Sequence, residues 1–186
     1  MKGNVKGSLV NMTKQFLTDS FGPDAIDKIA REIGEENAKK ILQPIFTFSW
    51  LPDKLFVDLL VAADKVYGKG DYTIAERIGY SISKEGVPKL YKVFIEVGNP
   101  FFVLKNAPRF WNQLHDNGRL EVTHTATSTA TVHIVDKKYP HKAFCRCMIG
   151  YIRGVLELSE VKDIQVKETK CNCDNELFCE YVLNWK

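Results

Sequence analysis

The stretch from Lys142 to Leu158 constrains the fold more than any other part of the chain. Apolar residues recur in it at the spacing of an α-helix, and they form two faces instead of one. The first face carries Cys145, Met148, Ile149, Ile152 and Leu156, and the second carries Phe144, Cys147, Tyr151 and Val155. Because a helix that is apolar on two sides must be covered on two sides, we expect this helix at the centre of the fold.

The chain before Gly118 is predicted to be mainly helical. Apolar spacing and turn signals indicate six or seven helices, with one of them beginning at Pro52 and another opened by Asn99-Pro100. We expect two separate helices over 74–83 and 88–97, divided at Gly86-Val87-Pro88. The aromatic connector 46–52 is expected to pack against the core.

After Gly118 the apolar period changes from about 3.6 to 2, which indicates strands. A hairpin is predicted over 119–134, and a second one follows the central helix, with a cysteine-bearing turn between its strands. The fold class is therefore α+β: an N-terminal helical half packed on a four-stranded antiparallel sheet with a central helix. We expect one domain over 1–186, mainly helical over 1–117, with hairpin, helix and hairpin over 118–186.

Size and charge exclude several classes of protein. The 186 residues suit one domain with a full core, and a net charge of +3 is too small to indicate nucleic-acid binding. We find no apolar run long enough for a membrane span and no signal-peptide pattern, so we expect a cytoplasmic protein. Five cysteines in a reducing compartment favour thiols or a metal over disulfides.

The cysteines are the first candidates for chemistry. Three lie in or just after the last turn and two lie on the central helix, so a tetrahedral zinc site is one interpretation. The predicted ligand set is Cys145, Cys171, Cys173 and Cys179, and His141 is an alternative ligand. Cys145 and Cys147 lie about 200° apart around the helix, so both cannot face one metal. The alternatives are buried packing, redox chemistry and acylation.

Histidines offer a second candidate. His115 shares a helix face with Leu104, Pro108 and Trp111, where it would be either a haem ligand or a satisfied histidine near the helix end. His124 and His133 fall on opposite strand faces. The sequence contains none of the common catalytic or nucleotide-binding motifs, so we identify no catalytic residues and expect no enzyme.

Two groups of motifs resemble known families. The run Gly150-Tyr-Ile-Arg-Gly154, the strand 161–168 and the segment from Cys171 to Cys179-Glu-Tyr resemble the end of the 4-vinyl reductase domain, with Asp174-Asn175 where that family usually has Gly-Asp. The opening segment, the helix after Trp50-x-Pro52, Gly70-Asp71 and Asn117-Gly118 resemble an uncharacterised family found mainly in myxobacteria.

Both families look like members of a superfamily that includes H-NOX sensor domains and TRAPP tethering subunits. The resemblance implies helices plus a four-stranded sheet that enclose an apolar cavity. In H-NOX domains the cavity holds haem, and in TRAPP subunits it can hold an acyl chain. The H-NOX haem-ligating histidine precedes a glycine by about nine residues, where this chain has Arg109, and the Y-x-S-x-R motif is missing. Haem is therefore not expected.

We expect a non-enzymatic sensor or regulatory domain that binds a small apolar ligand in a pocket between the helical half and the sheet. Its predicted lining includes Trp111, Leu114, His115, Met148 and Ile152. The alternatives are a protein-interaction or tethering module with a filled or acylated cavity, and an enzyme of tetrapyrrole metabolism. A protein partner or a homodimer is a further possibility, zinc is a possible cofactor, and haem is not expected.

Overall fold

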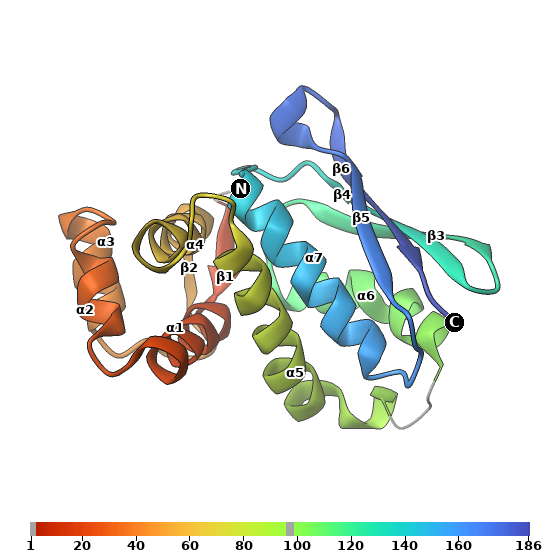
Figure 1. The fold of residues 1–186 in the computed structure, drawn as a ribbon, viewed down its shortest axis with the longest axis horizontal. Coiled ribbons are helices and arrows are strands. Elements are labelled where there is room, and N and C mark those ends of the chain that lie inside the picture. Colours follow the sequence, from red (N-terminus) through yellow and green to blue (C-terminus); the bar gives the residue numbers. More distant parts are fainter. Residues whose placement is uncertain (1–2, 96–98) are drawn as a thin grey trace.

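The computed structural model describes residues 3–95 and 99–186, with side chains at all of these positions except 87–95, 124 and 125. The helices in this part of the chain are α1 (Gly7–Phe21), α2 (Ala25–Ala30), α3 (Glu35–Leu42), α4 (Asp53–Tyr67), α5 (Thr73–Ile95), α6 (Pro100–Leu114) and α7 (Lys142–Glu157). The strands are β1 (Asn4–Lys6), β2 (Trp50–Pro52), β3 (Arg119–Ala126), β4 (Thr129–Val135), β5 (Gln165–Lys170) and β6 (Phe178–Asn184). Helices α1 to α4 gather at one end of the molecule, away from the sheet formed by β3 to β6 (Figure 1).

The main sheet is antiparallel and has the strand order β3-β4-β6-β5. Its two hairpins are joined through β4 and β6, where Val132 pairs with Tyr181 and Ile134 pairs with Cys179. Alternate residues of β4 and β6 are buried, as a period of two requires when one face of a sheet covers a core. The predicted α+β class, with a four-stranded antiparallel sheet, is confirmed.

Helix α7 lies between α5 and the main sheet (Figure 1). Residues of both of its apolar faces are buried, among them Phe144, Cys145, Cys147, Met148 and Ile152. The prediction that this helix is central is confirmed.

Glycines let α5 and α7 approach backbone to backbone. A Cβ atom on Gly150 would lie 1.9 Å from the carbonyl oxygen of Glu76, and one on Gly79 would lie 1.9 Å from the carbonyl oxygen of Cys147. Both distances are far below van der Waals contact, so no larger residue fits at either position while the helices keep this spacing. The contact holds one side of α7 in a fixed place.

Two local expectations are wrong, and one element was not predicted. Residues 73–95 form one continuous helix rather than two, since a proline removes one backbone hydrogen bond but a helix packed along a neighbour can continue through it. The aromatic connector is not in the core, because Phe46 and Phe48 are 85% and 80% exposed. The short sheet in which β1 pairs with β2 was not predicted from the sequence.

Within residues 3–95 and 99–186, every helix is too short or too polar to cross a lipid bilayer.

Candidate functional site

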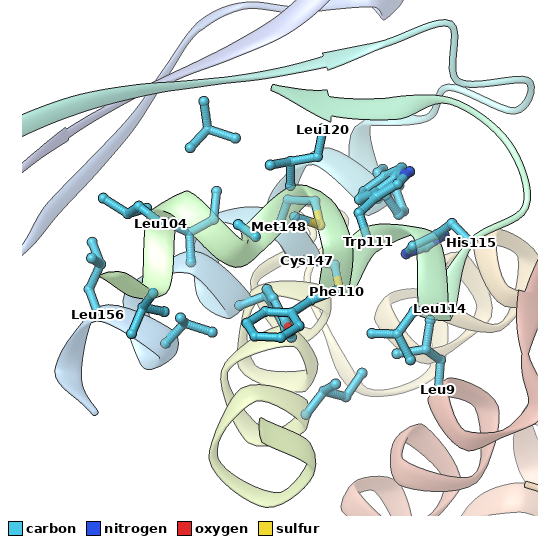
Figure 2. A pocket seen from close by; sticks show the side chains of 18 of the residues that line it. Leu9, Leu104, Phe110, Trp111, Leu114, His115, Leu120, Cys147, Met148 and Leu156 are labelled. Atoms are coloured by element: carbon cyan, nitrogen blue, oxygen red, sulfur yellow. The ribbon is translucent and has the colours of Figure 1, made fainter. Parts of the chain in front are cut away.

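A cavity of about 70 Å³ lies between α6, α7 and the inner face of β3 and β4, with α1, α4 and α5 closing its other sides. The side chains that line it are almost all apolar. The five residues predicted from the sequence, Trp111, Leu114, His115, Met148 and Ile152, all contribute to this lining. Figure 2 shows Leu104 and Leu156 at one end of the cavity, and Leu9, Leu114 and His115 at the other.

The helical period places these side chains together. Leu104, Trp111 and Leu114 are spaced by seven and three residues on α6, and Met148 and Ile152 by four residues on α7, so each group lies on one face of its helix. From the sheet, Leu120 of β3 and Val132 of β4 point to the same hollow. Two apolar stripes that face a sheet therefore enclose the cavity.

His115 is the most unusual side chain in the lining. It follows the last residue of α6, is only 7% exposed, and stacks on Trp111 with ring centroids 4.0 Å apart. Its Nδ1 atom is buried and has no hydrogen-bond partner among the described residues. The interpretation of His115 as a histidine whose hydrogen bonds are satisfied within the protein is thus wrong for this nitrogen. The indole N–H of Trp111, the ring on which His115 stacks, donates to the carbonyls of Asn117 and Gly118.

A buried ion pair borders the cavity. Lys137 binds Asp53, the first residue of α4, and both side chains are buried. The Lys137 ammonium also lies 4.6 Å from the ring centre of Phe144, a lining residue. Burial, together with this nearby cation, lowers the pKa of His115 well below its ordinary value. The imidazole is therefore neutral at physiological pH and able to accept or donate a hydrogen bond.

A second group of side chains lies near the beginning of α7, beside the turn that joins β5 and β6. Cys145, Glu168, Cys171 and Cys179 have ligand atoms that all lie within 4.8 Å of one another, and we call these four residues the Cys–Glu cluster. The Sγ atom of Cys145 is 3.6 Å from that of Cys171 and 3.7 Å from that of Cys179. Sulfur atoms bound tetrahedrally to zinc at about 2.3 Å lie about 3.8 Å apart, so these two distances are close to those between thiolates that share one zinc ion.

The cluster differs from the predicted ligand set at one position. Three of the four predicted cysteines meet, and Glu168 of β5 joins them. The Cys173 side chain is half-buried beside the cluster, in the short 3₁₀ turn Asn172–Asp174, and contacts the thiol of Cys171. His141 lies outside it, because its Nδ1 accepts from the backbone N–H of Ala143 and caps α7.

Glu168 could have been found from the strand pattern. It falls on the half-buried side of β5, two residues after Val166, where an unpaired carboxylate is costly. Its Oε1 atom is buried without a hydrogen-bond partner among the described residues. An inward-facing acid next to Cys171 was therefore a signal for a ligand that the sequence analysis passed over.

The thiols of the cluster differ in acidity. Cys145 beside Cys179, helped by the backbone N–H of Asn172, lowers the pKa of Cys179 to about 7. The pKa of Cys145 is raised by the same contact with Cys179 and by burial. The pKa of Cys171 is also raised, by burial, to about 12. A thiolate is the form that binds a metal, and the arrangement favours one at Cys179 even in the absence of an ion.

His133 does not join either site. His133 of β4 is bonded to Glu180 of β6 at 2.9 Å, on the outer face of the main sheet. Val132, the preceding residue of β4, points to the inner face of the sheet and lines the cavity. The side chain of His124 lies outside the described part of the chain.

Searches with the sequence find no matching protein-family model and no matching curated protein. The structure, by contrast, is similar to solved H-NOX domains. An H-NOX protein from S. oneidensis in the Fe(II)NO state superposes with a TM-score of 0.75 at 12% identity, covering 97% of this chain and 99% of that one. A Cs H-NOX mutant with 4-cyano-L-phenylalanine gives 0.74 at 17% identity, covering 97% and 96%. An oxygen-binding H-NOX domain related to soluble guanylate cyclases gives 0.69 at 16% identity, covering 97% and 95%. The chain therefore has the H-NOX-like fold.

Proposed function

We propose that the protein is a non-enzymatic sensor or regulatory domain that binds a small apolar ligand in the cavity between α6, α7 and the main sheet. The observation that carries the proposal is an apolar cavity with one neutral, buried histidine whose Nδ1 has no partner among the described residues. A cavity of this kind excludes water, and a single polar atom in it orients a ligand. A ligand with a hydroxyl or N–H group would supply the hydrogen bond that His115 lacks.

The volume limits the ligand. About 70 Å³ is half of the roughly 150 Å³ of an engineered apolar cavity that holds benzene. A molecule of a few heavy atoms fits directly, whereas a single ring requires side chains to move. Met148 lines the cavity and is the residue type that adjusts most easily.

We propose further that the domain works without haem. Drug-sized ligands already require about 300 Å³ or more, several times the space present here. Neither arginine nor lysine belongs to the described lining, and Lys137, which borders it, is already paired with Asp53, so a propionate could use Lys137 only by breaking that ion pair. The lining histidine is stacked flat against Trp111. The residues present therefore do not fit haem, although the similar H-NOX structures include one in the Fe(II)NO ligation state and one that concerns heme distortion in the H-NOX family. Hemin added to the purified protein should produce no sharp Soret band, and a band abolished by His115→Ala would refute the haem-free proposal.

Toluene and phenol test ligand binding, since they are nearly equal in size and only phenol carries a hydroxyl group. Isothermal titration should detect both, and His115→Phe should weaken phenol by about fivefold or more while leaving toluene within twofold. Ala107→Leu, which fills the cavity from α6, should abolish both, and Ala126→Leu at an exposed position should abolish neither. Failure of the wild-type protein to bind either compound would contradict the proposal.

A native mass spectrum separates the remaining alternatives. A co-purified small molecule released on unfolding supports the ligand-binding domain. An acyl adduct on Cys147, the buried thiol of the cavity lining, would instead support an interaction module with a filled cavity. The third alternative needs an activity assay, in which turnover of a tetrapyrrole substrate would support an enzyme.

The Cys–Glu cluster favours a second role, and we propose that it holds one structural zinc ion. The three sulfur atoms have the spacing of tetrahedral thiolates, and Glu168 brings an oxygen atom that has no other partner in the described chain. An ion here would fasten the last hairpin to the beginning of α7. Such a site is closed by four protein ligands, which is typical of structural zinc.

Cys145 and Cys147 provide a matched pair of variants for the zinc proposal, because both are buried on α7 and only Cys145 belongs to the cluster. Elemental analysis should find close to one zinc per chain in the wild type and in Cys147→Ala, and almost none in Cys145→Ala. Chelator should lower the melting temperature of the first two proteins only. Metal-free wild-type protein whose melting temperature is unaffected by chelator would refute the zinc site.

A further inference from the structure

A second hollow adjoins the cavity. It is an open groove of about 670 Å³ between α6 and the β3–β4 hairpin, and its lining is apolar apart from Lys105 and Thr127. Leu104 of α6 is the residue that lines both the groove and the cavity. Its side chain is only 5% exposed, so it lies between an interior space and one that is open to solvent.

The sheet register shows that the two hollows are neighbours. On β3, Leu120 lines the cavity and Val122, two residues further on the same face, lines the groove. Val122 pairs directly with Val132 of β4, which lines the cavity. The groove therefore continues the cavity along one face of the sheet, and Leu104 covers the border from the side of α6.

The backbone of α6 is weakened where this border lies. Pro108 is inside α6 and also lines the groove. Since proline has no N–H, the carbonyl of Leu104, four residues earlier, cannot make the usual helical hydrogen bond. The turn that carries Leu104 therefore opens at lower cost than an ordinary helical turn.

We propose that Leu104 is a gate between the groove and the cavity, that ligands enter past it, and that it sets the length of the ligand that binds. The proposal rests on the ligand-binding function proposed above. With Leu104 closed, the ligand is limited to the cavity. With Leu104 displaced, an apolar molecule that consists of a ring and a linear alkyl tail occupies both hollows, with its ring in the cavity and its tail in the groove.

An alkylbenzene series tests the length limit: benzene, ethylbenzene, butylbenzene and hexylbenzene, with dissociation constants from isothermal titration. Each methylene group that becomes buried should improve affinity about fourfold. In the wild type this gain should stop at a short tail. In Leu104→Ala it should continue, so that the hexylbenzene-to-benzene affinity ratio rises at least about tenfold, because the groove then joins the cavity.

Leu9→Ala is the matched control, because Leu9 is 4% exposed and lies at the opposite end of the cavity. It should enlarge the cavity without joining it to the groove, so the affinity ratio should stay within about twofold of the wild type. Equal ratios in the two variants would overturn the gate. If the wild type and both variants bind no alkylbenzene, the ligand-binding function itself is wrong, and the gate is wrong with it.

Pro108→Ala tests the entry route without changing the cavity lining, since Pro108 contacts the groove alone. It restores the N–H that can bond to the Leu104 carbonyl. Association and dissociation of benzene, measured by NMR exchange, should both slow at least about threefold, with the dissociation constant unchanged. Unchanged exchange rates would show that ligands enter elsewhere. Circular dichroism and melting curves establish that each variant is folded.

Discussion

The two sides of α7 are built on opposite principles. Towards α5, glycines bring the two backbones into contact, and there is no space for even one added methyl group at Gly150. Towards α6, side chains of ordinary size leave a cavity of about 70 Å³ and a histidine nitrogen without a partner. Tight packing on one side fixes the helix, which allows looser packing on the other side without loss of a unique fold.

This difference has a functional meaning under the proposed ligand-binding role. A site has to be held rigidly by its surroundings and still leave room for a ligand. In this chain α7 satisfies both requirements, because its α5 side supplies the rigid contact and its α6 side supplies the room. If the proposed zinc ion is bound, it would hold the beginning of the same helix from a third direction.

The largest expected effect comes from closing the space between α5 and α7. Gly150→Ala places a Cβ atom against the backbone oxygen of Glu76, which cannot rotate away, so the helices must separate. We expect the free energy of unfolding, measured with urea, to fall by about 3 kcal/mol or more.

Gly154 gives the matched comparison, because the atom that its Cβ would meet is the Ser83 hydroxyl, 1.9 Å away. A side chain can be removed, so the cost of Gly154→Ala should be largely relieved by adding Ser83→Ala. Gly150 and Gly154 are one helical turn apart, a spacing that predicts close approach to the sheet or to a neighbouring helix, and in the structure the neighbour is α5. Equal, small costs for Gly150→Ala and Gly154→Ala would show that the two helices are not in contact.

An intermediate effect is expected from the buried histidine on the looser side. Because burial lowers the pKa of His115 below the 6.5 of an exposed imidazole, the unfolded chain takes up this proton more readily than the folded chain. The contribution of His115 to the free energy of unfolding is therefore fully present above about pH 6.5 and is lost as the pH falls below that value. The loss is up to about 1.4 kcal/mol per pH unit.

The variant His115→Phe should flatten this part of the curve of unfolding free energy against pH. The pKa of His141 is also lowered by burial, but His141 is less buried, so His141→Asn should flatten the curve less. If His115→Phe leaves the slope between pH 5.5 and 6.5 unchanged, His115 is not buried as a neutral group.

The last effect should change sign between the two sides of α7. Ala107→Leu adds atoms where there is an empty volume and should raise the free energy of unfolding by about 0.5–2 kcal/mol. Ala75→Leu adds the same atoms to a fully buried position of α5 and should lower it by about 1–3 kcal/mol. Two changes of the same sign, measured by urea unfolding, would contradict the contrast between the tight and the loose side.

The sequence by itself determined the elements that depend on local periodicity. The double apolar face of 142–158, the change of period after Gly118 and the alternation in both hairpins led to the correct class and sheet, because these patterns repeat over a few residues. It also predicted five of the residues that line the cavity and three members of the Cys–Glu cluster.

Only the tertiary structure decided what lies between those elements. Helix α5 continues through Pro88 although the local pattern predicts a break there, and the β1–β2 pair joins segments more than forty residues apart. Glu168, Lys137 with Asp53, and Leu104 with the groove are set by contacts between distant strands and helices. A local pattern fixes which side of an element is apolar. The spacing and register of the elements, which arise from the packing of the whole chain, decide whether that side meets a neighbour, a metal ligand or an empty space.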